Sequence, residues 1–138
     1  MKIDTAIHKV INSPEVKAIV KNLRKEYRWW SWTRGGCFAF AEALIAAFPN
    51  AKLWVLAERM IDDWASHHAF VKYHGKFYDA TGCITKRKII KYCDKFQIQR
   101  CNLKIGEVEN WPDELPVWYP DQEFVTSKEI ELITKMLR

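Results

Sequence analysis

Apolar residues recur at helical spacing in several stretches of the chain. The clearest stretch follows two glycines, where positions 37, 40, 41, 44 and 48 place five apolar side chains on one helix face. Ser13-Pro14-Glu15 marks an earlier helix start, and Thr126 with Glu129 forms a capping box before a late one. The pattern therefore predicts helices over residues 14–27, 37–48, 85–95 and 127–137.

Shorter apolar runs bounded by turn residues predict strands over residues 52–57, 68–73, 76–81 and 97–103. The two middle strands are joined by His74-Gly75, and an irregular stretch with three prolines runs from Trp111 to Gln122. The order of elements is helix, helix, strands, helix, strand, helix. This order predicts an α+β fold in which a small antiparallel sheet packs on the helix that begins at Cys37. The length of 138 residues favours a single domain over residues 1–138.

The composition is that of a globular protein, with 49% hydrophobic and 28% charged residues. No apolar run approaches the roughly 20 residues that span a bilayer, and the first residues lack the apolar core of a signal peptide. The four cysteines form no C-x-x-C pair, so we interpret them as reduced thiols. These features predict a cytoplasmic protein without membrane partners.

The net charge of +5 is distributed unevenly along the chain. Residues 84–104 contain seven basic residues and one acidic residue, whereas residues 105–138 contain three basic and eight acidic residues. The simplest interpretation of the basic segment is a solvated helix face. It could also be a binding surface, or the two segments could attract each other.

The hairpin at His74-Gly75 brings two polar residues together. A two-residue loop pairs Tyr73 with Lys76, and alternation then places His68 and Asp79 on the same face as diagonal neighbours. Such neighbours lie about 7–8 Å apart at the backbone, within reach of an imidazole and a carboxylate. A carboxylate fixes the tautomer of a histidine and stabilises its protonated form. His67 points to the other face, so the register favours His68.

Cys37 is the candidate nucleophile for this pair. It occupies the first turn of a helix, where unpaired N–H groups and the helix dipole favour a thiolate. Gly35-Gly36 permits a tight entry and leaves room for a substrate, and the N–H of Cys37 could donate to an oxyanion. The alternative is that Cys37 is an inert core residue and that Asp79 only caps a turn with Thr81 and Gly82.

Residues 35–41 and 68–82 resemble the papain-like cysteine hydrolases, and more closely the small transglutaminase-like, phage and bacterial members. Those proteins place a cysteine on a helix, a histidine on a strand, and an aspartate or asparagine on the next strand. The resemblance implies a papain-like fold and a catalytic triad of Cys37, His68 and Asp79. Many of these enzymes carry a glutamine before the cysteine as a second oxyanion donor. This chain has none there, so Ser31, Thr33 or the Trp32 indole would serve instead.

The residues before Cys37 are also predicted to shape a substrate groove, because a helix N-terminus points at its ligand. We expect Trp30 or Trp32, with Arg34, to form its wall, Gly36 to lie at the substrate, and residues 111–120 to cover part of it. In the alternative, these tryptophans fill the core.

Three functions follow from these observations. The first is a cysteine-dependent hydrolase or acyl-transfer enzyme, of the peptidase, amidase or deamidase type, with a protein or peptide-like substrate. The second is a non-catalytic binding or inhibitory module on the same fold, and the third is a nucleic-acid binder that uses the basic segment. No cofactor is expected. No metal is expected either, because His67, His68, His74 and Cys83 lack the spacing of a structural zinc site.

Overall fold

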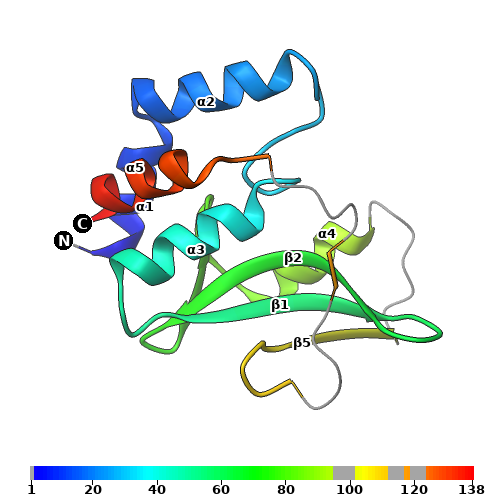
Figure 1. The fold of residues 1–138 in the computed structure, drawn as a ribbon. Helices are drawn as coiled ribbons and strands as arrows, with labels where there is room; N and C mark the ends of the chain where they lie inside the picture. The colour runs from blue at the N-terminus through cyan, green and yellow to red at the C-terminus, as the bar shows by residue number, and fades with distance from the viewer. Residues whose placement is uncertain (1, 95–101, 112–116, 119–123) are drawn as a thin grey trace.

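The computed structural model describes residues 2–94, 102–111, 117, 118 and 124–138. These residues form an α+β fold in which an antiparallel sheet is covered by helices (Figure 1). The helices are α1 (Ile3–Ile11), α2 (Pro14–Arg24), α3 (Cys37–Ala47), α4 (Lys86–Asp94) and α5 (Ser127–Leu137). The strands are β1 (Lys52–Arg59), β2 (Trp64–Tyr73), β3 (Lys76–Asp79), β4 (Gly82–Ile84), β5 (Leu103–Glu107) and β6 (Val117–Trp118).

The sheet has the order β4-β3-β2-β1-β5, with every neighbouring pair antiparallel. The short strand β6 pairs in parallel with β2 at Ala65 and Ser66. Strand β3 pairs with β2 farther along, from Val71 to Tyr73. Strands β6 and β3 therefore pair with different parts of the same side of β2. The stretch of β2 between these two pairings contains His68.

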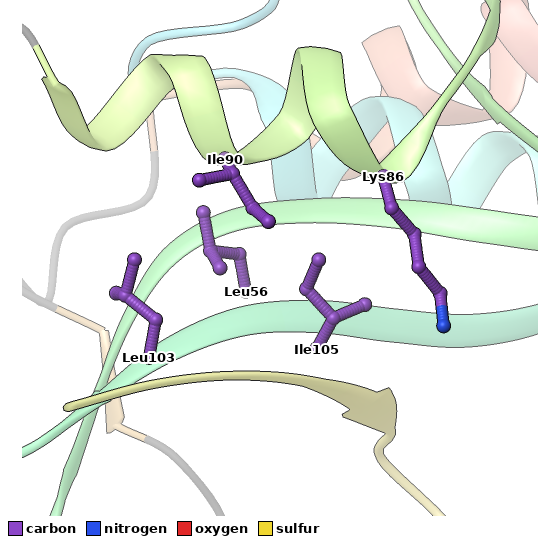
Figure 2. Close-up of a pocket in the computed structure, with 5 residues that line it drawn as sticks. All are labelled: Leu56, Lys86, Ile90, Leu103 and Ile105. Atoms are coloured by element: carbon purple, nitrogen blue, oxygen red, sulfur yellow. The ribbon is translucent and has the colours of Figure 1, made fainter. Parts of the chain in front are cut away.

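Two hydrophobic clusters lie on opposite faces of the sheet. The larger one joins α1, α2, α3 and α5 to residues such as Val55, Ala69 and Val71. The smaller one joins Ile89 of α4 to Phe70 and Phe77, and α4 lies behind β2 in Figure 1. Between α4 and the sheet remains a hollow of about 290 Å³ (Figure 2), lined by Leu56, Lys86, Ile90, Leu103 and Ile105.

The hairpin between β2 and β3 has the predicted register. Tyr73 pairs with Lys76, and the two loop residues, His74 and Gly75, have φ angles of 49° and 78°. Positive φ at both positions is what a two-residue turn with the twist of the strands requires. The N-terminal caps of two helices are also confirmed: the Ser13 side chain accepts from Val16, and Thr126 forms its capping box with Glu129.

Other elements differ from the prediction. Helix α1 was not expected, although Ile3, Ala6, Ile7 and Val10 are buried at helical spacing. The last predicted strand was placed too early: β5 begins at Leu103, and residues 97–101 lie outside the described residues. Strand β4 was not predicted because it is three residues long and is defined by its pairing with β3. Residues 112–116 and 119–122 of the expected irregular stretch also lie outside the described part of the chain. Among the described helices, none has the length and apolar character needed to cross a bilayer.

Candidate active site

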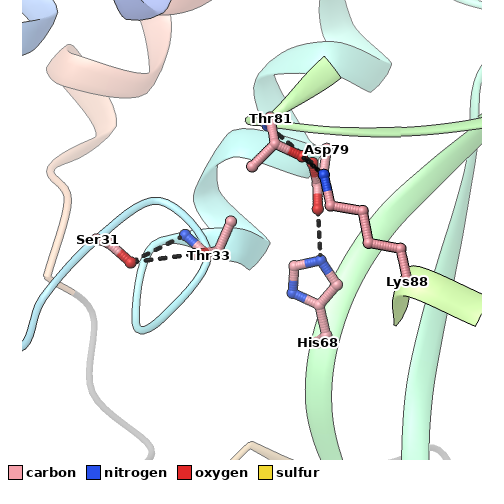
Figure 3. Close-up of polar contacts among 6 residues, drawn as sticks. All are labelled: Ser31, Thr33, His68, Asp79, Thr81 and Lys88. Atoms are coloured by element: carbon pink, nitrogen blue, oxygen red, sulfur yellow. Dashed lines mark hydrogen bonds and ion pairs between the residues drawn. The ribbon is translucent and has the colours of Figure 1, made fainter. Parts of the chain in front are cut away.

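His68 and Asp79 form a buried hydrogen-bonded pair. The Nε2 atom of His68 lies 2.9 Å from Oδ2 of Asp79, and the two residues are only 1% and 3% exposed (Figure 3). The hairpin register positions both groups, because it places them on the same face of β2 and β3. The His68 ring also stacks on Phe70, with ring centroids 5.8 Å apart. His67 is turned elsewhere and contacts Glu58 at 2.9 Å, because a bulge in β2 leaves it outside the regular pairing.

The second oxygen of Asp79 is held by Thr81. Both the backbone N–H and the hydroxyl of Thr81 donate to Oδ1, at 2.8 and 2.5 Å. The ammonium of Lys88 donates in turn to the Thr81 hydroxyl oxygen at 3.4 Å (Figure 3). A carboxylate with partners on both oxygens cannot rotate freely, so Asp79 presents a fixed acceptor to His68.

Cys37 is the first residue of α3 and is 7% exposed. The Cys37 side chain lies close enough to the His68 imidazole to help raise the pKa of that histidine. Although α3 packs on the opposite face of the sheet from Phe70, the interval in the ladder beside β2 allows the start of α3 to meet His68. His68 is thus bonded to Asp79 and has Cys37 as a neighbour.

The environment raises the pKa of His68 from its usual 6.5 to about 9. Burial acts in the other direction, because it penalises the charged imidazolium, but the hydrogen bonds to Asp79 and Cys37 outweigh it. For Asp79, burial alone would raise the pKa, whereas the hydrogen bonds from His68 and Thr81 bring it below its usual value. At neutral pH the pair is therefore an imidazolium beside a carboxylate.

A family comparison covers this site. Residues 16–134 match phage YunG-like proteins. The chain belongs to this family. The matched range includes Cys37, His68 and Asp79. No curated protein and no solved structure matches the chain.

The Gly35-Gly36 turn packs closely against the Trp30 indole. Gly35 has a φ of 97°, and a Cβ on Gly36 would lie 2.6 Å from Cζ2 of Trp30. The Gly36 N–H donates to the Ser31 carbonyl at 3.0 Å. The Trp30 indole thus fills the space above Gly36. The Gly36 backbone N–H is already bonded to the Ser31 carbonyl. Gly36 permits the close packing of the loop before Cys37 against Trp30.

The residues predicted to form the groove wall differ in their exposure. Trp30 is fully buried and Trp32 is 7% exposed, and their rings contact each other at 4.9 Å within the larger core cluster. Both belong to the larger core cluster, and Trp32 also lines a groove beside α2. Arg34 is exposed and lies 5.6 Å from the ring of Trp29. The exposed aromatic residues beside the loop before Cys37 are Trp29 and Phe38. The helical pattern left Phe38 off the apolar face, whereas no pattern distinguished Trp29 from Trp30 and Trp32.

The groups that were predicted to donate to an oxyanion differ in the bonds that they already make. The Cys37 N–H belongs to the first turn of α3, where helical geometry provides no acceptor within the helix. The hydroxyls of Ser31 and Thr33 bond each other at 3.2 Å (Figure 3). The Trp32 Nε1 is buried and has no hydrogen-bond partner among the described residues. Cys37 therefore supplies the clearest donor.

No metal site emerges from the residues that the structure describes, which contain no group of three or more suitable His, Cys, Asp or Glu side chains. Cys37 and Cys83 are free thiols, and Cys83 is exposed.

Proposed function

We propose that this protein is a cysteine-dependent hydrolase or acyl-transfer enzyme of the peptidase, amidase or deamidase type, with a papain-like fold. The observation that carries the proposal is the buried bond of 2.9 Å between His68 and Asp79, at a histidine whose pKa the neighbouring Cys37 helps to raise. A buried histidine between a thiol and a carboxylate is the arrangement that nucleophilic catalysis by cysteine requires. The substrate would be an amide, isopeptide or ester bond in a protein or peptide-like molecule.

In the reactive state His68 would be the imidazolium and Cys37 the thiolate. The opposite charges of these two groups would attract each other across the site. The sulfur would attack the carbonyl carbon, and the Cys37 N–H would donate to the resulting oxyanion. His68 would return its proton to the leaving amine as the carbon–nitrogen bond breaks. Water or another nucleophile would then attack the thioester carbon and give its proton to His68, and the carbon–sulfur bond would break to release Cys37 as the thiolate.

Asp79 would set the orientation of the base. Its bond to Nε2 favours the tautomer with the proton on Nε2, which leaves Nδ1 for proton exchange with the nucleophile. The bonds from Thr81 hold the carboxylate in place during this exchange. The order of elements supports the papain-like resemblance, since the cysteine begins α3, the histidine lies on β2, and the aspartate ends β3.

Alkylation by iodoacetamide tests the proposal. Cys37 should react faster than Cys83 near neutral pH, although Cys37 is buried and Cys83 is exposed. The reason is that His68 takes the proton of Cys37, and the thiolate is the reactive form. Peptide mapping by mass spectrometry would follow both thiols in one sample, so Cys83 is an internal control. In a His68→Asn variant that remains folded by circular dichroism, the advantage of Cys37 should disappear. Equal or slower labelling of Cys37 in the parent protein would refute the proposal.

The binding or inhibitory module is the alternative that the same site must be tested against. A Cys37→Ala variant separates the two, because a thiol is essential for catalysis and dispensable for binding. If Cys37→Ala retains the biological effect of the protein, the effect does not depend on acyl transfer.

A further inference from the structure

A groove of about 590 Å³ lies between α2, the end of α1 and the loop that leads to Cys37. We call it the basic groove; its lining residues are Ile11, Asn12, Lys17, Val20, Lys21, Arg24, Lys25 and Trp32. Four of the eight are cations, and no carboxylate is among them. In contrast, the hollow beneath α4 contains a single lysine among aliphatic side chains.

The cations of the basic groove are not neutralised within the described part of the chain. None of the four takes part in an ion pair there. Lys17, Lys21 and Arg24 follow one another at helical spacing, so their charges gather along a single face of α2. Like charges that are held together repel each other, and an anionic ligand would relieve this repulsion.

The floor of the groove is apolar. Ile11, Val20 and Trp32 contribute to it. Because Trp32 is only 7% exposed, little of its ring is open to a ligand. Single-stranded nucleic acid is usually bound by stacking its bases on open aromatic faces, which this groove does not provide. A polypeptide that carries both carboxylates and apolar side chains fits the combination of cationic rim and apolar floor.

The groove is connected to the nucleophile loop. Arg24, on its rim, donates from Nε to the Trp30 carbonyl at 2.8 Å. Trp32, in its floor, contacts Phe40 of α3, with ring centroids 5.6 Å apart. A chain bound in the groove would therefore lie against the segment that enters α3 at Cys37.

We propose that the basic groove binds an acidic segment of a polypeptide and thereby docks the substrate of the Cys37 site. Binding itself does not require the chemistry of Cys37, whereas the role in docking a substrate rests on the proposed function. The inference names the substrate class as proteins that carry an acidic, partly apolar segment.

Fluorescence anisotropy tests this binding on the full chain with Cys37→Ala, which prevents turnover. The probe is a labelled twelve-residue peptide of alternating Glu and Leu at low salt. The Lys17→Glu/Lys21→Glu variant should weaken binding about tenfold or more, since two attractive contacts become repulsive. The matched control is Lys52→Glu/Lys76→Glu, which reverses two exposed lysines outside the groove and should change the affinity less than about twofold.

Two further probes complete the test. A peptide with Gln in place of Glu should bind at least about tenfold more weakly, and so should a labelled twelve-residue oligothymidylate. Absence of peptide binding at low salt would overturn the inference, as would equal losses in the two double variants. Tighter, groove-dependent binding of the oligonucleotide would overturn it in favour of nucleic acid. Cys37 alkylation in the parent protein is a separate readout. If Cys37 is unreactive but the peptide binds in the basic groove, only the proposed enzymatic function is refuted. If Cys37 is reactive but the peptide does not bind in the groove, only the groove proposal is refuted.

Discussion

Asp79 is the residue whose surroundings are best defined in the site. One of its oxygens bonds His68, and the other accepts two bonds from Thr81. Lys88 bonds the same threonine from outside. The order of these contacts makes Thr81 a positioning residue, because it acts on His68 only through the carboxylate that it holds.

Replacing Thr81 by valine should reveal this role. The substitution removes the hydroxyl bond to Asp79 and keeps the shape of the side chain, so we expect a loss of about 1–2 kcal/mol in the free energy of unfolding. The alkylation rate of Cys37 should fall, and its pH profile should shift, because His68 is less firmly oriented. Thr81→Ser retains the hydroxyl and should behave like the parent protein. Urea unfolding and alkylation as a function of pH would measure both effects.

The matched control for this experiment is Lys88→Met, which removes only the outermost bond. It should change the unfolding free energy by less than about 0.5 kcal/mol, as is usual for exposed charged contacts. If Thr81→Val and Thr81→Ser give the same pH profile, Thr81 does not position Asp79.

At the scale of elements, the Gly-Gly turn determines where α3 begins. Gly35 adopts a left-handed conformation, and Gly36 has a φ of −103° that any residue can adopt. The need for glycine at position 36 therefore comes from the close approach of Trp30 and not from backbone strain. The Trp30 indole packs against the Gly35-Gly36 turn, and the first turn of α3 follows directly from this packed segment.

Gly36→Ala should consequently destabilise the protein by about 1–3 kcal/mol, because the added methyl group forces the buried indole to move. The same movement should slow the alkylation of Cys37. Gly75→Ala is the informative comparison: Gly75 has a φ of 78° but nothing within 4 Å of an added Cβ. It should cost about 1 kcal/mol through strain alone and leave Cys37 unaffected. Thermal unfolding and alkylation would detect the difference, and a Gly36→Ala protein as reactive as the parent would contradict this account.

Local signals in the sequence predict part of the fold and part of the site. The hairpin and the capping box depend on a few adjacent residues, so the register that joins His68 to Asp79 could be derived. The meeting of Cys37 with His68 depends on the interval between β3 and β6, which no local pattern specifies. Burial of Trp30 is likewise non-local, because a tryptophan in the core and one in a groove have the same sequence neighbours. Helix α1 shows the remaining difficulty, since the mixture of charged and apolar residues in its sequence resembles alternation.

For the molecule as a whole, the position of charge in space differs from its position along the chain. The sequence draws attention to the basic residues from 84 to 104, but the groove lined by four cations lies beside α2. The charges that matter most for stability belong to neither of these regions, because they are the buried charges of His68 and Asp79. His68 and Asp79 are an ion pair in the interior, and their protonation links the folding of the whole chain to pH.

The pH dependence of stability follows from the two pKa shifts. The pKa of His68 is raised to about 9 in the folded protein, so its contribution is fully present below pH 6.5 and is lost as pH rises through 9. The pKa of Asp79 is lowered, so its contribution is present above its usual value and is lost as pH falls through the lowered one. We expect the melting temperature to be highest at mildly acidic pH and to fall between pH 7 and 9. Circular dichroism melts across this range would show it, and His68→Asn should flatten the fall. A melting temperature that rises from pH 7 to 9 would contradict the assignment.

The two-residue turn at His74-Gly75 has a consequence for how this protein can vary. Side chains on a strand face alternate sides, so the contact between His68 and Asp79 depends on whether the number of residues between them is odd or even. A change of one residue in the turn would direct the carboxylate away from the imidazole without altering either residue. A change of two would preserve the facing and shift the pair along the strands. The site is therefore tolerant of substitutions in the turn and sensitive to the parity of its length.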